Sequence, residues 1–201
     1  MVLKNYRTLT STQNYTGTAT TTTTDLPRDF LIQRILLNFN GTTTLSGTST
    51  LVTDALLKCV KAIRIKAVGE GSSRTIFEVS GKDLYAMNMF DYGSASGTLV
   101  RPTATGAANN KTGWVIDLRC NKLDPDDYSV ALPSYLLSSL QLEIEYTAFD
   151  GTSYSTNLTS ISNTMSITLV EGIPEAGEDF SSNPLMTVLS KQLSGDTSTG
   201  T

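Results

Sequence analysis

The sequence predicts an all-β fold: a single jelly roll, an eight-stranded antiparallel barrel or sandwich, with one short helix and extended terminal arms. Thr, Ser and Gly are abundant, and with charged residues at only 17% of the chain, Glu and Lys are too sparse for long surface helices. About eight short segments have strand-like patterns, without regular strand–helix alternation. The 201 residues, 39% of them hydrophobic, are enough for one domain with a real core.

Strict alternation of apolar and polar side chains marks the clearest strands. Residues 114–121 and 140–148 both alternate with period two, which is typical of half-buried antiparallel strands. Residues 30–39 are apolar on both faces, so we place them centrally in a sheet, ending at Asn40-Gly41. The polar residues 42–53 are either a loop or an edge strand. Further strands are expected over residues 57–67, 75–79 and 165–169, with short candidates at 128–132 and 154–158.

The segment Ser80-Gly81-Lys82-Asp83 has the layout of a helix N-terminal cap and predicts that a helix begins there. Leu84, Met87 and Phe90 follow on one side of a short helix that we expect to close one end of the barrel. Residues 93–112 are rich in small and polar residues and predict a long surface loop.

Three regions organise the chain: an extended Thr-rich N-terminal arm (1–25), a jelly-roll domain (26–180) and a flexible C-terminal tail (181–201). The arm has almost nothing to bury, and β-branched Thr tolerates extended backbone, so it can add as a strand to a neighbour's sheet. Deleting residues 1–24 should then leave the domain folded and weaken assembly.

Catalysis is disfavoured, because the chain contains no His and no phosphate-cradling or dinucleotide motif. We therefore predict that the protein is not an enzyme and has no catalytic residues, cofactor or metal. Glu143 and Glu145, two apart on one strand face, resemble a glycosidase carboxylate pair, but an exposed strand face carries Glu anyway. Asp124, Asp126 and Asp127 form either a solvated turn or an ion site.

Charge and cysteine content leave two questions open. The net charge of −4 makes sequence-specific nucleic-acid binding improbable, and Lys58, Arg64 and Lys66 read first as one solvated strand face. An inner-face contact of these residues with a viral membrane or genome is the alternative. Cys59 and Cys120 are either buried free thiols or one disulfide.

Three stretches carry a family resemblance: residues 26–37, Leu56-Leu57 through Ile63-Arg64-Ile65, and Val79 to Tyr85 with Asp91-Tyr92-Gly93. Together, over residues 26–93, they resemble the single jelly-roll major capsid proteins of tailless, membrane-containing icosahedral dsDNA viruses, the sphaerolipovirus-like group. The resemblance implies a barrel upright on an icosahedral shell, paired into larger capsomers, with termini that tie neighbours or face an inner membrane. It supplies no catalytic residues.

The function expected from this reading is that of a viral structural protein, most simply a capsid protein that self-assembles into capsomers in the virion. Its partners would be copies of itself and, as an open question, a second capsid protein, with no small-molecule substrate. Residues 1–7 lack a secretory signal, so we expect synthesis in the host cytoplasm. The alternative is a carbohydrate- or receptor-binding β-sandwich, a spike or fibre head, that uses Tyr92, Tyr135 or Tyr154 in its loops.

Overall fold

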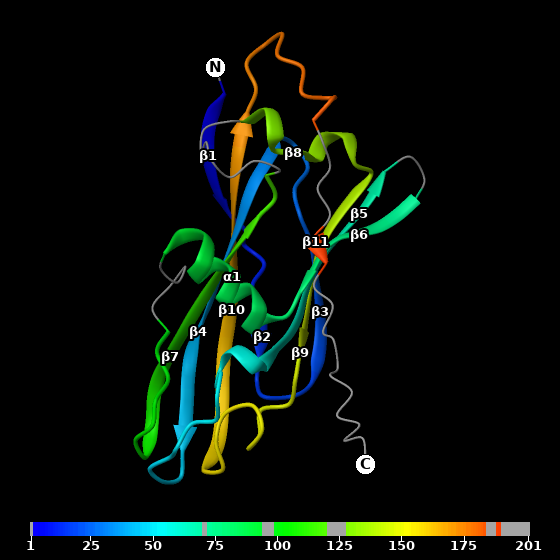
Figure 1. Ribbon diagram of the computed structural model, residues 1–201. Helices are drawn as coiled ribbons and strands as arrows, with labels where there is room; N and C mark the ends of the chain where they lie inside the picture. Colours follow the sequence, from blue (N-terminus) through cyan, green and yellow to red (C-terminus); the bar gives the residue numbers. More distant parts are fainter. Residues whose placement is uncertain (1, 70–71, 94–98, 120–127, 184–187, 190–201) are drawn as a thin grey trace, which may run out of the picture.

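Two β-sheets packed face to face make up the fold, seen in a computed structural model that describes residues 2–69, 72–93, 99–119, 128–183 and 188–189 (Figure 1). Sheet A has the strand order β1-β10-β4-β7, with β2 also on β10 and β8 on β4. Its strands are β1 (Leu3–Thr8), β2 (Gln13–Tyr15), β4 (Leu31–Leu45), β7 (Gly106–Asp117), β8 (Leu132–Pro133) and β10 (Leu158–Ile173).

Sheet B has the order β11-β6-β5-β9-β3. Its strands are β3 (Thr20–Asp25), β5 (Val60–Gly69), β6 (Ser72–Val79), β9 (Ser139–Tyr146) and β11 (Val188–Leu189). All neighbouring strands of the two sheets are antiparallel except β11 and β6, which run parallel.

The strand pairs are nested around the β5–β6 hairpin. Strand β5 pairs with β6, β4 with β7, β3 with β9 and β2 with β10, and successive pairs alternate between sheet B and sheet A. A chain that folds back on itself and rolls over two sheets in this way is a jelly roll, so the predicted fold class is confirmed. In the described residues the sheets form a sandwich rather than a closed barrel.

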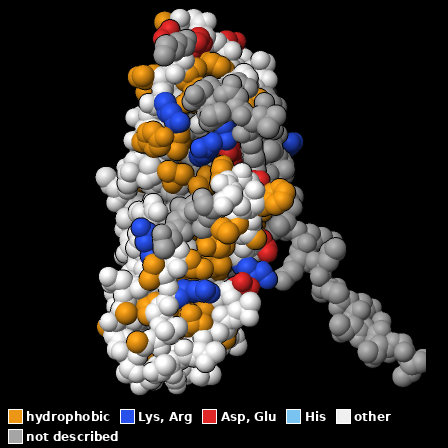
Figure 2. Space-filling view, turned by 60° about the vertical axis from the view of Figure 1, so that its left-hand side comes forward, with side chains coloured by type: hydrophobic (Ala, Val, Ile, Leu, Met, Phe, Trp, Pro, Cys, Tyr) orange, Lys and Arg blue, Asp and Glu red, His pale blue; other side chains and the backbone are white. Residues whose placement is uncertain are grey.

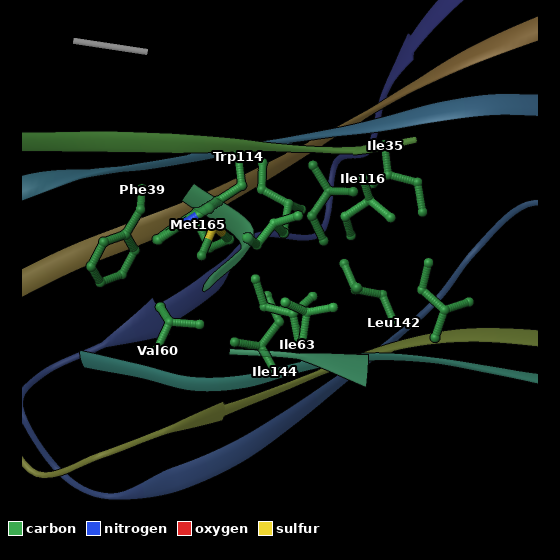
Figure 3. Close-up of a cluster of buried hydrophobic side chains, with 14 of the residues drawn as sticks. Ile35, Phe39, Val60, Ile63, Trp114, Ile116, Leu142, Ile144 and Met165 are labelled. Carbon is green, nitrogen blue, oxygen red and sulfur yellow. The ribbon is translucent and has the colours of Figure 1, made fainter. Parts of the chain in front are cut away.

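The core lies between the sheets (Figure 3). Sheet A contributes side chains such as Ile35, Trp114 and Met165, and sheet B contributes Ile63 and Ile144 from the opposite side; all five are buried. Alternate residues of each strand face this layer because successive side chains in a strand point to opposite faces. The alternation seen in the sequence over residues 140–146 therefore corresponds to burial, as predicted. In the 114–121 segment the prediction is wrong beyond Ile116: β7 ends at Asp117, and Asp117 and Arg119, expected on an exposed face, are buried and form an ion pair at 2.6 Å.

The central strand β4 is longer than expected. It does not end at Asn40-Gly41 but continues to Leu45, paired on both sides with β7 and β10. Gly41 lies between Asn110 and Asn163, whose amide groups hydrogen-bond to each other across it at 2.6 and 2.9 Å. The missing side chain of Gly41 makes room for this buried pair, so here glycine serves close packing rather than a turn.

The predicted helix start is confirmed. Helix α1 (Gly81–Tyr92) begins after Ser80, whose hydroxyl accepts a hydrogen bond from the Asp83 N–H at 3.1 Å. Leu84 is buried, but Phe90 is 91% exposed and does not belong to the packed side. The helix connects sheet B to sheet A along the side of the sandwich, and the Trp114 indole N–H donates to the Gly81 carbonyl oxygen at 2.7 Å.

Residues 3–25 form strands of this chain's own sheets rather than a free arm. Strands β1 and β2 pair with β10, and β3 pairs with β9. Tyr15 is fully buried, and Asn5 and Arg7 both donate to the buried Glu171 carboxylate at 3.0 Å. The segment is extended, as predicted, but it has partners that a sequence without known strand register does not reveal.

Other boundaries also differ from the expectations. Residues 57–59 form a 3₁₀ turn, η1 (Leu57–Cys59), before β5, and residues 128–130 form another, η2 (Tyr128–Val130). A third, η3 (Ser134–Leu136), follows β8. Strand β7 begins at Gly106, inside the predicted loop, and residues 154–157 are turns rather than a strand. Cys120, Asp124, Asp126, Asp127 and most of the predicted tail lie outside the described residues.

Candidate interaction surface

A ladder of alternating charges covers the outer face of sheet B. Arg64 lies at its centre on β5, directly opposite Glu78 of β6 and Glu143 of β9. Its guanidinium contacts these two carboxylates at 2.6 and 3.1 Å and Glu145 at 2.9 Å. Lys66 adds a contact to Glu143, and Lys61 one to Glu145, both at 2.5 Å. Three basic groups thus face three acidic groups.

These ion pairs argue against the hypothesis that Glu143 and Glu145 are a glycosidase carboxylate pair. Hydrogen bonding from Lys66 holds the pKa of Glu143 below its ordinary value, and hydrogen bonding from Lys61 does the same for Glu145. A retaining or inverting glycosidase needs one carboxyl with a raised pKa to act as the acid. The arrangement gives neither residue that property.

The ladder makes a stabilising contribution that depends on pH. Because the folded-state pKa of Glu143 is lowered, the contribution is present above the unfolded pKa of about 4.3 and is lost as the pH falls through the folded value. We expect Glu143→Gln to lower the free energy of unfolding at pH 7 by about 1 kcal/mol or less, since the group is partly exposed, and by less at pH 3.

Urea unfolding at both pH values measures this effect. A double-mutant cycle with Lys66→Met isolates the Lys66–Glu143 term from other consequences of either substitution. An equal loss for Glu143→Gln at pH 7 and pH 3 would contradict the assignment.

Lys58, Arg64 and Lys66, which the sequence suggested as one basic face, do not lie in one cluster. Arg64 and Lys66 are bound in the ladder, whereas Lys58, on η1, lines an open pocket of about 290 Å³. Lys61 and Lys82 line the same pocket, together with Ser80 and Asp83 at the start of α1. Lys58, Lys61 and Lys82 therefore lie around the N-terminus of α1 rather than along one strand face.

The outer edge of β7 is covered at Lys111 and Val115. The side-chain amide of Asn88, on α1, accepts from the Val115 N–H at 2.7 Å and donates to the Val115 carbonyl oxygen at 2.8 Å. Four residues earlier, the backbone of Val100 exchanges two hydrogen bonds with Lys111. An unpaired strand edge is a template for pairing with another chain, and these contacts block it. Nothing in the sequence around Asn88 indicated that its side chain contacts a strand edge.

Exposed aromatic side chains are dispersed. Phe90 and Met89 project from α1, and Figure 2 shows hydrophobic side chains scattered between charged ones on the side of the molecule that includes β7 and α1. Tyr135 is 39% exposed, but Tyr154 is fully buried, and the Tyr92 hydroxyl donates to Asp117 at 2.8 Å. The loop tyrosines proposed for ligand binding are therefore not gathered as one exposed set.

Of the remaining chemical candidates, Cys59 is the one that lies within the described residues. Cys59 is a buried free thiol whose pKa is raised by burial to about 12, so it is not a nucleophile at neutral pH. In the described part of the chain no three His, Cys, Asp or Glu side chains are grouped as metal ligands. None of the helices described is long and apolar enough to span a membrane.

Comparison with known proteins finds similarity in structure alone. No family model matches the chain, and no curated protein does. Among solved structures, the chain is similar to the major capsid protein of STIV, Sulfolobus Turreted Icosahedral Virus: the TM-score is 0.61 and the identity 22%, over 87% of this chain and 50% of that one. A chain in the atomic structure of the same virus gives 0.58 and 22%, over 86% and 46%.

The PBCV-1 virus capsid gives a TM-score of 0.57 with 14% identity, over 87% of this chain and 43% of the other. At these identities the similarity establishes a common fold. The chain spans about half the length of the solved chains it matches. The matched share of this chain, 86–87%, is larger than either sheet alone, so the shared fold includes both sheets.

Proposed function

We propose that this protein is a coat subunit of an icosahedral viral shell and works by assembling with other subunits. One observation carries the proposal: 87% of this chain matches the fold of the STIV major capsid protein, and 87% matches that of the PBCV-1 capsid. A structural role without catalysis is supported by the absence of His from the sequence and by the ion pairs of Glu143 and Glu145.

The proposed partners follow from size. Each matched capsid chain is about twice the length that this chain covers, so one copy provides about half of such a chain. We propose that a second copy, or a second capsid protein, supplies the other part. In this proposal the protein is made in the host cytoplasm and resides in the capsid shell of the virion. We propose that the jelly-roll domain also includes residues 3–25, because β1 and β2 pair with β10 and β3 pairs with β9.

A contact with a viral membrane or genome, if the shell makes one, is better served by the pocket lysines than by the sheet B ladder. Arg64 and Lys66 contact carboxylates on the face of sheet B. Lys58, Lys61 and Lys82 instead border one open pocket, where Lys61 also contacts Glu145 and Lys82 lies 3.8 Å from Asp54. Phosphate groups bind to clustered basic side chains in a salt-dependent way. We therefore move the proposed contact from Lys58, Arg64 and Lys66 to these three lysines.

Sedimentation velocity of the purified chain, over a concentration and salt series and with electron micrographs of the fast fraction, tests the coat function. We expect capsomers or closed shells whose amount rises with concentration. A small species that stays the same at all concentrations, together with saturable binding on a glycan array, would favour the receptor-binding alternative.

Adding anionic vesicles to the same samples tests the lysine pocket: the double variant Lys58→Gln/Lys82→Gln should reduce co-flotation of the protein with the vesicles, and unchanged co-flotation would contradict that contact.

A further inference from the structure

The outer strands of the sandwich are not equally protected. Sheet A ends at β7 and at β1 with β2, and sheet B ends at β11 and β3. Strand β11 lies along β6 at Phe77 and Glu78, and the side chain of Asn88 and the backbone of Val100 cover β7. Strand β1 has six residues, as β3 does, but it carries Lys4 and Arg7, and basic side chains on an edge strand discourage pairing with another chain.

Strand β3 has none of these protections in the described part of the structure. Its sequence is five consecutive threonines followed by Asp25, and no described residue pairs with its outer side. Threonine is β-branched and suits extended backbone, and the strand contains no Lys, Arg or Pro. An edge whose one charged residue is Asp25, at its C-terminal end, is a template for another strand.

The register identifies the backbone groups that face outward. The Leu26 N–H donates to the Leu140 carbonyl oxygen, which makes this a hydrogen-bonded antiparallel pair. Hydrogen-bonded and non-hydrogen-bonded pairs alternate along an antiparallel ladder, so Thr24 and Thr22 bond to β9 as well. The N–H and C=O groups of Thr21, Thr23 and Asp25 therefore point away from β9, toward the open edge.

We infer that two copies of this chain join edge to edge through β3, antiparallel about a two-fold axis at Thr23, so that sheet B continues from one copy into the next. This inference deepens the proposed coat function, on which it rests, because it names a surface through which subunits associate. A two-fold contact uses the same patch on both copies, so the patch must be complementary to itself.

Self-complementarity follows from the sequence of β3. With the axis at Thr23, that residue pairs with Thr23 of the second copy, and Thr21 pairs with Asp25 of the second copy. All three outward-facing residues then exchange hydrogen bonds. The two Asp25 carboxylates lie at opposite ends of the contact, each across from a threonine, so no like charges face each other.

The edge is also held in shape before it binds. On the inward side of β3, the Thr22 hydroxyl donates to the side-chain oxygen Oε1 of Gln13 at 2.5 Å, and Nε2 of the same side chain donates to the Thr24 hydroxyl at 2.9 Å. Gln13 is buried and links β2 to β3. An edge that is already extended loses less conformational entropy on pairing, which favours association.

Thr23→Pro in the full chain tests the inference. Proline removes the outward-facing N–H at the centre of the contact and leaves the β3–β9 ladder intact, and proline is tolerated on edge strands with this orientation. Thr23→Val is the matched control, because it keeps the backbone donor and the β-branched shape. Thr21→Lys is a second test that adds a charge to the edge without changing the backbone. Thermal unfolding checks that each variant is folded.

Sedimentation velocity gives the outcome. We expect Thr23→Pro and Thr21→Lys to weaken dimer formation at least tenfold, and Thr23→Val to associate as the unsubstituted chain does. Association unchanged in both Thr23→Pro and Thr21→Lys overturns the inference, as does an unsubstituted chain that never forms a dimer. The coat function is judged separately: shells that still form from Thr23→Pro refute the β3 contact alone, whereas dimers that never grow into capsomers refute the coat function alone.

Discussion

Deletion of residues 1–24 is expected to abolish cooperative folding of this protein. The segment contains β1, β2 and nearly all of β3, so its loss strips the outer strands from both sheets and exposes the edges of β10 and β9. It also removes Tyr15, which is fully buried, stacks on Tyr146 at 4.9 Å and donates its hydroxyl to the Thr147 carbonyl oxygen.

The size of the effect can be judged from Tyr15 alone. Replacing a buried large aromatic side chain with Ala typically costs about 3–5 kcal/mol, against a total stability of about 5–15 kcal/mol for a small domain. Urea unfolding followed by circular dichroism should therefore show no native baseline for the deletion and a large loss for Tyr15→Ala. Tyr6→Ala, at a side chain 61% exposed, should stay within about 0.5 kcal/mol of the parent. A deletion variant that unfolds cooperatively at the parent's midpoint would show that residues 1–24 are an independent arm.

Gly41→Ala adds only one methyl group, but it is expected to destabilise the sandwich strongly. A Cβ at this position would lie 2.5 Å from Asn163 Oδ1 and 2.6 Å from Asn163 Cα, and closer still to the Ser162 carbonyl oxygen. Relief requires movement of the β10 backbone and separation of the buried Asn110–Asn163 amide pair. Overpacking costs about 1–3 kcal/mol and an unsatisfied buried amide about as much again, so we expect a loss of about 3 kcal/mol or more.

Gly47→Ala is the control for this substitution. The nearest atom to a Cβ at Gly47 is Asn157 Nδ2 at 3.5 Å, an ordinary contact, so the free energy of unfolding should change by about 0.5 kcal/mol or less. Both variants are compared in the same urea titration. A loss below 1 kcal/mol for Gly41→Ala would mean that β4 and β10 can separate locally at little cost, and that Gly41 is not needed for packing.

Side-chain periodicity was sufficient for the parts of the fold that bury one face. Residues 140–146 and 165–169 alternate without interruption, and both segments are strands with the expected inward residues. The cap at Ser80 was readable because its hydrogen bond to Asp83 is local in sequence. In each case the physical cause lies within a few residues of the pattern that reports it.

The rest depended on contacts between residues far apart in the chain. Asn40-Gly41 has the composition of a turn, but Asn110 and Asn163 on neighbouring strands decide its conformation. The basic residues around Arg64 looked like a free positive face because the opposing carboxylates lie on β6 and β9. The threonines of β3 look like a linker until β9 is placed beside them. Without register, none of these partners is visible in the sequence.

Because the strand pairs are nested, β1, β2 and β3 are synthesised well before β9 and β10, the strands with which they pair. Arg7 and Glu171 are 164 residues apart, and β1, β2 and β3 all pair with β9 or β10. While the chain emerges from the ribosome, the threonine-rich start must therefore remain unpaired until almost everything else has been made. Non-local pairing of this kind slows folding and leaves strand edges open to neighbouring chains. Residues 16–25 have low charge and no large apolar side chain. While this segment is unpaired, it therefore has little tendency to bind to the wrong surface.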